Sequence, residues 1–102
     1  MKEKVFLLMF DAQMTTKDDR RRYGTFITDI KAEGFSILQK SVYMRHIVGN
    51  QDAKDLNRRI MLLTPPSIEV VVFSMTRKDY ERMKTINCIL PKLVDNGTII
   101  WV

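Results

Sequence analysis

The feature that most constrains this sequence is a short apolar run near its start, Val5 to Phe10, which ends at Asp11. A run of this length is too short for an ordinary buried helix and suits a central strand that is buried on both faces. Asp11 would then lie where the strand leaves the core. Such an aspartate is either a turn or capping residue or part of a chemical site, and the run alone leaves both interpretations open.

Capping residues and apolar spacing predict two long helices. Thr16 can cap a helix that ends at Gly34, and the acidic residues that follow Thr16 suit the positive end of the helix dipole. Asn50 can cap a second helix, which must end at Pro65-Pro66. Apolar residues recur at helical spacing in both segments, so each has one stripe to bury: Tyr23, Phe26, Ile27 and Ile30 in the first, and Ala53, Leu56, Ile60 and Leu63 in the second.

Three further strands are predicted. Residues 35–48 are rich in β-formers, with a bulge or bend expected at 39–41. Residues 68–75 centre on a valine-rich run, and residues 98–102 follow a turn signal at 95–97. A short helix capped by Thr76 should run to about Lys84, whereas residues 86–93 fit no single element. Within 35–48, the polar residues Lys40, Arg45 and His46 are expected to face solvent or a partner, with His46 at the surface.

The order of these elements predicts an α+β fold. If residues 35–48 form a bent strand or a hairpin, the chain follows the ferredoxin-like pattern β-α-β-β-α-β with an antiparallel sheet, a short extra helix and a C-terminal strand. We expect a single domain over residues 1–102, with residues 85–102 as a C-terminal extension. The helices would cover one face of the sheet. The strands are too apolar for the other face to be exposed to water, so we expect that face to pack against a second copy of the chain.

Composition narrows the functional classes. The 102 residues carry a net charge of +5 with a pI of about 9.6, which favours an anionic partner, nucleic acid first. The single cysteine, Cys88, excludes an intrachain disulfide and fits a reducing cytoplasm, and the single histidine excludes a multi-histidine metal site within one chain. No apolar run approaches the roughly 18 residues of a membrane span, and no signal peptide is recognisable. We therefore expect a cytoplasmic protein with no membrane partner.

Three consecutive arginines, Arg20-Arg21-Arg22, fall in the second turn of the first predicted helix. At about 100° per residue they spread over most of the helix circumference, so each taken alone is best read as a solvated side chain. The helix follows directly from the strand that ends at Asp11, so the three guanidinium groups would also place positive charge beside that carboxylate. They form either a solvated face or a phosphate-binding rim.

Several stretches in a fixed order resemble the CRISPR-associated endonuclease Cas2 family, the small partner of the CRISPR integrase, and most of all the form found beside Cas9-type systems. The matching stretches span about residues 4–84, and their order and spacing are more specific than any single motif. They are Phe10-Asp11, Thr16 to Phe26, Glu33-Gly34-Phe35 with Gln39 and Ser41-Val42-Tyr43, Pro65-Pro66, and Thr76 to Tyr80. Two positions depart from the family pattern. Gln13 stands where a proline is common, and Asp29 stands where an apolar or aromatic residue is usual.

The resemblance implies a homodimer in which the two Asp11 carboxylates face each other across the two-fold axis. Two such carboxylates with waters would suit Mg²⁺, which makes Asp11 the candidate catalytic and metal-binding residue of a metal-dependent endonuclease. We find no obvious second acid or general base beside Asp11 in the sequence. The resemblance also implies that the terminal strand, residues 98–102, can add to the sheet of the partner chain.

A role in spacer acquisition is implied as well. In the family, the homodimer bridges two dimers of the CRISPR integrase and supports double-stranded prespacer DNA, which needs a scaffold rather than cleavage. Basic residues can bind the nucleic-acid backbone, DNA or RNA, without reading bases. The candidates for this contact are Arg20, Arg21, Arg22, Lys40, Arg45, Arg77 and Lys78.

Functions of other classes remain open at this point. A ferredoxin-like module that binds single-stranded RNA would need exposed aromatic residues on its sheet, and Phe6, Phe10 and Phe73 are candidates. All three stand in very apolar strands, so we expect them to be buried. A toxin-like ribonuclease of similar fold would use the same Asp11. A small-molecule-sensing regulatory dimer is a further alternative, although the sequence carries no ligand signature for it.

Overall fold

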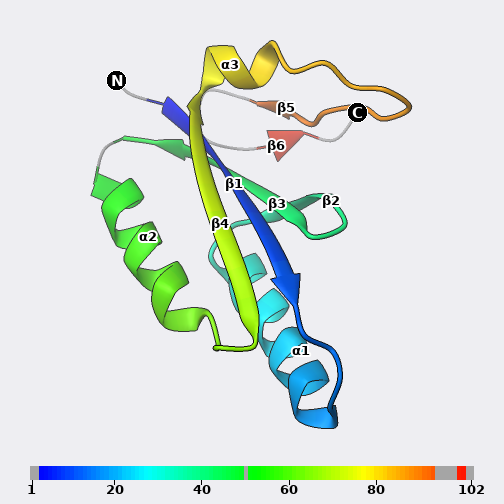
Figure 1. Cartoon of the computed structure of the whole chain (residues 1–102). Coiled ribbons are helices and arrows are strands. Elements are labelled where there is room, and N and C mark those ends of the chain that lie inside the picture. Colours follow the sequence, from blue (N-terminus) through cyan, green and yellow to red (C-terminus); the bar gives the residue numbers. More distant parts are fainter. Residues whose placement is uncertain (1–2, 50, 94–98, 101–102) are drawn as a thin grey trace.

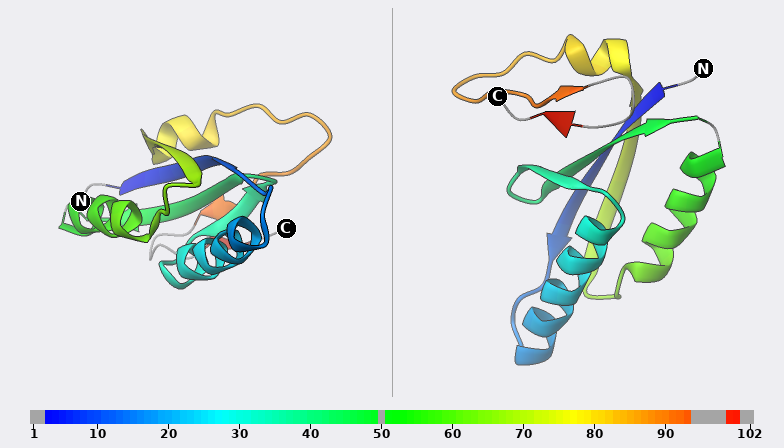
Figure 2. Two further views of the ribbon diagram at one scale, coloured as in Figure 1. Left: turned by 60° about the horizontal axis from the view of Figure 1, so that its bottom comes forward. Right: turned by 180° about the vertical axis from the view of Figure 1, so that it is seen from behind.

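Two helices lie against one face of a four-stranded antiparallel sheet (Figures 1 and 2). The structure is a computed structural model that describes residues 3–49, 51–93 and 99–100. The elements follow the expected β-α-β-β-α-β order, then a short helix and a two-stranded hairpin, which confirms the predicted fold class. They are β1 (Glu3–Ala12), α1 (Lys17–Ala32), β2 (Ser36–Gln39), β3 (Val42–Val48), α2 (Gln51–Leu63), β4 (Ile68–Thr76), α3 (Arg77–Glu81), β5 (Lys92–Leu93) and β6 (Ile99–Ile100).

The apolar run at the start of the chain forms the central strand. The strand order is β2-β3-β1-β4, so β1 pairs with β3 on one side and with β4 on the other, both antiparallel. The bend expected at 39–41 is the turn between β2 and β3. The pairing of these strands shifts between Ile37 and Gln39, and Ser41 adopts a positive φ of 67°. Residues 35–48 are thus a hairpin with an irregular register.

The main core lies between the sheet and the two long helices, which lie behind the sheet in Figure 1 and in front of it in the right panel of Figure 2. Phe6, Leu8 and Phe10 of β1 point to this side and are buried with Phe26 and Ile30, from the predicted stripe of α1. The rings of Phe10 and Phe26 meet edge to face with centroids 5.5 Å apart. The start of α1 is fixed by a capping box, in which Asp19 N–H donates to Thr16 Oγ1 over 3.0 Å and Thr16 N–H donates to Asp19 Oδ2 over 3.2 Å.

The second face of the sheet is covered at one end by the chain itself. A smaller apolar cluster joins Val5 and Met44 of the sheet to Tyr80 of α3 and Leu93 of β5. The buried hydroxyl of Tyr80 donates to the carbonyl of Pro91 over 2.7 Å and ties α3 to the segment that leads into β5. Residues 86–93, unassigned from the sequence, thus form an irregular loop that ends in β5. The described residues leave the rest of this face open.

His46 was expected at the surface, and that expectation is wrong. The side chain of His46 is fully buried, and its Nε2 lies 3.1 Å from Glu3 Oε1. Arg77 Nη1 approaches the same oxygen at 3.3 Å. His46 pairs with Val5 across β3 and β1, so it points to the face that α3 covers, and the sequence of residues 35–48 alone does not reveal that cover.

Two other expectations are corrected. Phe73 is not buried: it lies on the second sheet face, beyond the part that α3 and β5 cover, and 53% of its surface is exposed. Phe6 and Phe10 are buried as expected. The short helix α3 ends at Glu81 rather than near Lys84. Of the predicted terminal strand, Ile99–Ile100 forms β6 and pairs with β5 of the same chain; the turn at 95–97 and residues 98, 101 and 102 lie outside the described residues.

Candidate functional site

Asp11 lies near the end of β1, on the face of the sheet that α1 and α2 do not cover. Successive side chains of a strand point to opposite faces, and Phe10 is buried on the helical side, so the Asp11 side chain points to the other side. Across the β1–β4 ladder its Cα partner is Glu69, the second residue of β4. Both side chains are exposed. Residues directly opposite in an antiparallel pair place their Cβ atoms about 5 Å apart on the same face. The chain therefore sets a second carboxylate beside Asp11, which the sequence did not reveal.

Asp11 and Glu69 line one hollow of about 280 Å³, together with Ala12, Gln13, Pro66 and Ser67. The backbone N–H of Gln13 donates to the carbonyl of Ser67 over 2.9 Å, which ties the two strand ends together just beyond the carboxylates. A proline, common at this position in the resembled family, has no N–H to make that bond. The hydroxyl oxygen of Ser67 is buried and finds no hydrogen-bond partner among the described residues.

The three consecutive arginines reach the same end of the molecule as Asp11. All three are exposed at the start of α1. Arg21 Nη2 lies 2.8 Å from Asp18 Oδ1, and Arg22 Nη2 lies 3.5 Å from Asp18 Oδ2. The hydrogen bond from Arg21, followed by the charge of Arg21, holds the pKa of Asp18 below its ordinary value. Arg20 donates to the carbonyl of Met14 over 3.4 Å.

Lys40 lies in the β2–β3 turn, at the same end of the fold as Asp11. The N–H of Phe10 donates to the carbonyl of Ser41 over 3.1 Å, so the turn lies beside the end of β1. The Lys40 side chain is exposed. Arg20, Arg21, Arg22 and Lys40 thus share the Asp11 end of the fold.

The other three basic candidates lie elsewhere. Arg45 is half-buried on the helical side of the sheet, where its Nε would lie 3.2 Å from a Cβ added to Gly34. Arg77 is held by Glu3 and also donates to the carbonyl of Leu93 over 3.1 Å. Lys78 is exposed on α3, beside the end of β4 that pairs with the start of β1. Seven residues of β1 separate that end from Asp11, which corresponds to about 23 Å.

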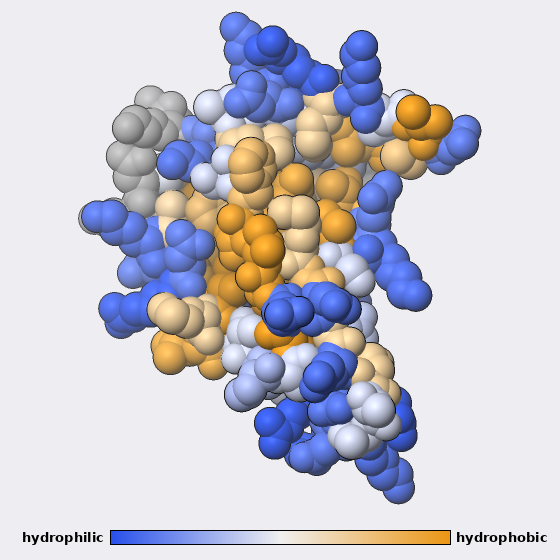
Figure 3. Space-filling model, in the orientation of Figure 1, coloured by the Kyte–Doolittle hydropathy of each residue, from blue (hydrophilic) through white to orange (hydrophobic). Residues whose placement is uncertain are grey.

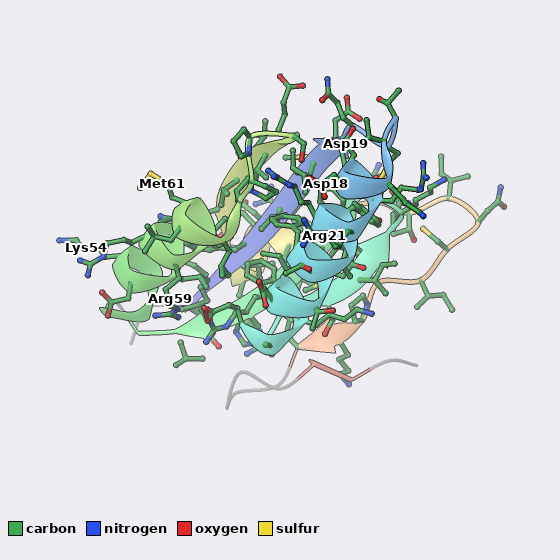
Figure 4. All side chains as sticks on the ribbon, turned by 90° about the horizontal axis from the view of Figure 1, so that it is seen from below. Asp18, Asp19, Arg21, Lys54, Arg59 and Met61 are labelled. Carbon is green, nitrogen blue, oxygen red and sulfur yellow. The ribbon has the colours of Figure 1, made fainter. Side chains whose placement is uncertain are left out.

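A groove of about 520 Å³ runs between the start of α1 and the end of α2. It is lined by Arg21, Arg22, Thr25 and Phe26 on one side and by residues 62–66 on the other. Figure 4 shows this end of the molecule, with Asp18 and Arg21 on α1 and Arg59 and Met61 on α2. Near the other end of α1, Arg59 Nε lies 2.7 Å from Glu33 Oε2, which links the two helices.

The open part of the second sheet face is apolar. Leu7 and Met9 of β1 lie opposite Phe73 and Val71 of β4 on this face. Val71 is 62% exposed and Phe73 is 53% exposed. Figure 3 shows apolar residues gathered over the middle of β1 and β4. We call these four residues the apolar sheet patch; Asp11 and Glu69 are the next pair along its two strands.

Among the described residues, no group of three or more histidine, cysteine, aspartate or glutamate side chains could hold a metal ion. Any ion at Asp11 would therefore take further ligands from water, substrate or a second chain. In the described ranges, no helix is both long and apolar enough to cross a membrane.

Comparison with known proteins identifies the family. Residues 4–83 match the family model of CRISPR associated protein Cas2. The chain belongs to the Cas2 family. The match covers the whole β-α-β-β-α-β unit, including Asp11, Glu69 and the α1 arginines, and confirms the resemblance drawn from the motifs. It stops before the loop and hairpin that follow α3.

Curated Cas2 proteins of several bacteria are similar to this chain. It is 34% identical over 77 residues to a protein of Lacticaseibacillus rhamnosus, covering 76% of each chain. It is 31% identical over 78 residues to one of Parvibaculum lavamentivorans, covering 76% of this chain and 77% of the relative. It is 31% identical over 77 residues to one of Ligilactobacillus salivarius, covering 76% of each. Each of these relatives is named a CRISPR-associated endoribonuclease Cas2.

Proposed function

We propose that this Cas2-family chain binds nucleic-acid backbone at its Asp11 end and hydrolyses phosphodiester bonds there with Mg²⁺ as cofactor. The observation that carries this proposal is the exposed Asp11 carboxylate at a polar hollow, at the same end as the α1 arginines. The names of the curated relatives, CRISPR-associated endoribonucleases, fit the same reaction class.

The residues at the hollow suit a hard divalent cation. Mg²⁺ in proteins is held by one or two carboxylates and keeps several waters or substrate phosphate oxygens. The hollow offers carboxylate oxygen and no sulfur or imidazole ligand among its lining residues. An ion bound there would polarise the phosphodiester and lower the pKa of an attacking water.

The remaining roles belong to the chain itself. Asp11 would fix the position of the scissile phosphate relative to the protein. Arg20, Arg21, Arg22 and Lys40 would neutralise neighbouring phosphates, because they are exposed at the same end. Such contacts position a strand without reading its bases, so the proposal predicts little sequence preference. With four phosphates neutralised per chain, the slope of log K against log salt should be about −3 to −4.

A homodimer is part of the proposal, and the apolar sheet patch supports it. A contiguous apolar surface of this kind marks an interaction site in a water-soluble chain. A second copy of the same patch is a self-complementary partner under two-fold symmetry. Asp11 adjoins the patch, so the two copies of Asp11 would lie at the edges of the shared interface.

A second candidate function is a scaffold in CRISPR spacer acquisition, with double-stranded prespacer DNA and the CRISPR integrase as partners. The sparse donor set favours it, since no third acidic, histidine or cysteine side chain joins Asp11 and Glu69 among the described residues. Exposed basic side chains lie at both ends of the fold, Lys78 at one end and the α1 arginines at the other. They would suit contact with a stretch of nucleic-acid backbone longer than a single active site covers.

The variant Asp11→Asn separates the two candidates. Single-stranded RNA and duplex DNA would be incubated with wild type and variant in Mg²⁺ and in EDTA, and spacer integration would be measured with the integrase present. Cleavage that requires both Asp11 and Mg²⁺ supports the nuclease. Integration that survives Asp11→Asn while cleavage is lost supports a scaffold role. Cleavage that is unchanged in Asp11→Asn contradicts the proposed site.

A further inference from the structure

We propose that the groove between α1 and α2 is a subsite for one unpaired nucleobase of a nucleic-acid strand whose backbone passes Asp11. This inference rests on the proposed function and adds a base contact to its backbone contacts. Pro66 lines both the groove and the hollow that holds Asp11, so the two adjoin. A strand with one phosphate at Asp11 can therefore bring a neighbouring nucleotide into the groove by passing over Pro66.

The α2 wall of the groove is apolar. Leu62 is 77% exposed, and Leu63, Pro65 and Pro66 line the groove beside it. Nucleic-acid-binding sites hold the faces of unpaired bases against apolar side chains and guanidinium planes. A base inside a duplex has both faces covered by its neighbours, so only an unpaired nucleotide can use this wall. The groove volume of about 520 Å³ falls in the range of sites for small ligands.

The end of α2 also offers hydrogen-bond acceptors. In a longer helix the carbonyl of Leu62 would accept from the N–H of the residue at position 66, but Pro66 has none, and α2 ends at Leu63. The hydroxyl of Thr64 donates to the carbonyl of Ile60 over 2.6 Å, and its oxygen can still accept. Every base carries an N–H on its pairing edge, so these acceptors suit any base and predict little sequence preference.

The α1 wall carries the positive charge. Arg21 and Arg22 line the groove, and each binds Asp18 through its Nη2 atom, which leaves further N–H donors on both guanidinium groups. Among the described residues, none that lines the groove is acidic. The two walls thus complement the two parts of a nucleotide, with the phosphate against α1 and the base against α2. An acidic peptide would meet the same charge, but the junction with the Asp11 hollow favours a nucleic-acid strand.

The test compares two oligonucleotides with the same backbone charge. One is an oligo-dA of about twelve nucleotides, and the other is its abasic counterpart, which lacks the bases. Fluorescence anisotropy would measure their binding in EDTA, so that metal-dependent cleavage plays no part. Wild type should bind the oligo-dA about tenfold more tightly than the abasic chain.

A pair of neighbouring residues on α2 supplies the variant and its control. Leu62→Ser should remove most of the preference for oligo-dA and leave the affinity for the abasic chain unchanged, because it removes apolar surface and no charge. Met61→Ser should keep the full preference, since Met61 is 70% exposed and does not line the groove. Circular dichroism would show that both variants are folded.

Three results would overturn the inference. The first is equal affinity of wild type for the two oligonucleotides. The second is a preference for oligo-dA that Leu62→Ser retains. The third is an acidic, leucine-containing peptide that binds wild type but not Leu62→Ser while no base preference is seen, because the groove would then belong to a protein partner.

The inference and the proposed function can fail separately. Asp11→Asn should keep the base preference in EDTA while it loses cleavage in Mg²⁺. Cleavage that requires Asp11, in a wild type without base preference, refutes the subsite and leaves the proposed function standing. A base preference that depends on Leu62, in a chain without Asp11-dependent cleavage, refutes the nuclease and supports the groove as a base-binding site.

Discussion

Replacing Phe73 by glutamate should separate the proposed homodimer into monomers without unfolding the chain. Phe73 belongs to the apolar sheet patch, opposite Leu7, and 53% of its surface is exposed in the single chain. A phenylalanine presents about 200 Å², so about 100 Å² per chain remains to be covered by a partner. At about 25 cal/mol per Å², this corresponds to about 2.5 kcal/mol per chain and about 5 kcal/mol per dimer.

A loss of about 5 kcal/mol raises the dissociation constant of the dimer by three to four powers of ten. The buried charges of two glutamates would weaken association further. The assay is sedimentation equilibrium over a wide range of protein concentrations, with circular dichroism as a check on folding. Met61→Glu is the matched control. Met61 is 70% exposed on α2 and is not part of the apolar sheet patch, so the same change in chemistry should leave the dimer intact (Figure 4).

Two results would refute this reasoning. The first is a folded Phe73→Glu variant that dimerises as tightly as wild type. The second is a wild-type chain that stays monomeric at high concentration, since the patch would then have no second copy as its partner.

Three further predictions concern the rest of the structure. Tyr80→Phe should lower the free energy of unfolding by about 1–3 kcal/mol, because the buried carbonyl of Pro91 loses its donor. Burial raises the pKa of Tyr80 from 10.0 to about 12, so its protonated form contributes stability that is fully present below pH 10 and is lost as the pH rises toward 12. Between pH 8 and pH 11, urea unfolding should show a larger loss of stability in wild type than in Tyr80→Phe, because burial also raises the pKa of Tyr43 and the variant keeps that contribution; equal losses would contradict the prediction. Arg21→Gln should reduce the salt slope of RNA or DNA binding by about 1, whereas Lys54→Gln on α2 should leave it unchanged, as measured by fluorescence anisotropy at several salt concentrations. Gly34→Ala should destabilise the chain by about 1–2 kcal/mol in urea unfolding, because Gly34 has a φ of 94° and a Cβ there would press on Arg45; an unchanged midpoint would refute the strain.

Local signals were sufficient to predict most elements of the fold. The hydroxyl of Thr16 caps the start of α1, and Pro65 and Pro66 prevent α2 from continuing. Both effects act within a few residues. The short, continuous apolar run from Val5 to Phe10 also predicted a central strand with Asp11 where it leaves the core. The order of the elements along the chain then predicted the ferredoxin-like pattern with an antiparallel sheet, which the β1–β4 and β1–β3 ladders confirm.

Three residues could not be placed correctly, because their surroundings depend on segments distant in sequence. His46 is buried by α3, Phe73 is exposed because the described residues leave its part of the second sheet face uncovered, and Glu69 lies opposite Asp11 only through the register of β1 with β4. The sequence did carry one signal for Glu69. In an antiparallel pair, the last residues of one strand lie beside the first residues of the other. Asp11 stands at the end of the first predicted strand and Glu69 at the start of the strand predicted at 68–75, so antiparallel pairing of these two strands would bring them together.

For the basic residues, too, the sequence predicts positions set by neighbouring residues and misses contacts made by distant segments. Arg20, Arg21 and Arg22 are exposed at the same end of the fold as Asp11 because α1 follows β1 along the chain. Arg77 was predicted as a nucleic-acid contact from its charge alone, yet it is held by Glu3 and by the carbonyl of Leu93, which come from the two ends of the chain. The number of charged residues does not distinguish a basic side chain that is available to a ligand from one that forms ion pairs and hydrogen bonds within the fold.

The most direct test of the proposed site is the anomalous scattering of Mn²⁺ in crystals of this protein grown with the ion. The proposed function predicts an anomalous peak within about 2.2 Å of an Asp11 carboxylate oxygen, and no peak there in crystals of Asp11→Asn. A map of wild type with no peak at Asp11, or with peaks only at other residues, would contradict a metal-dependent phosphodiester site at the end of β1.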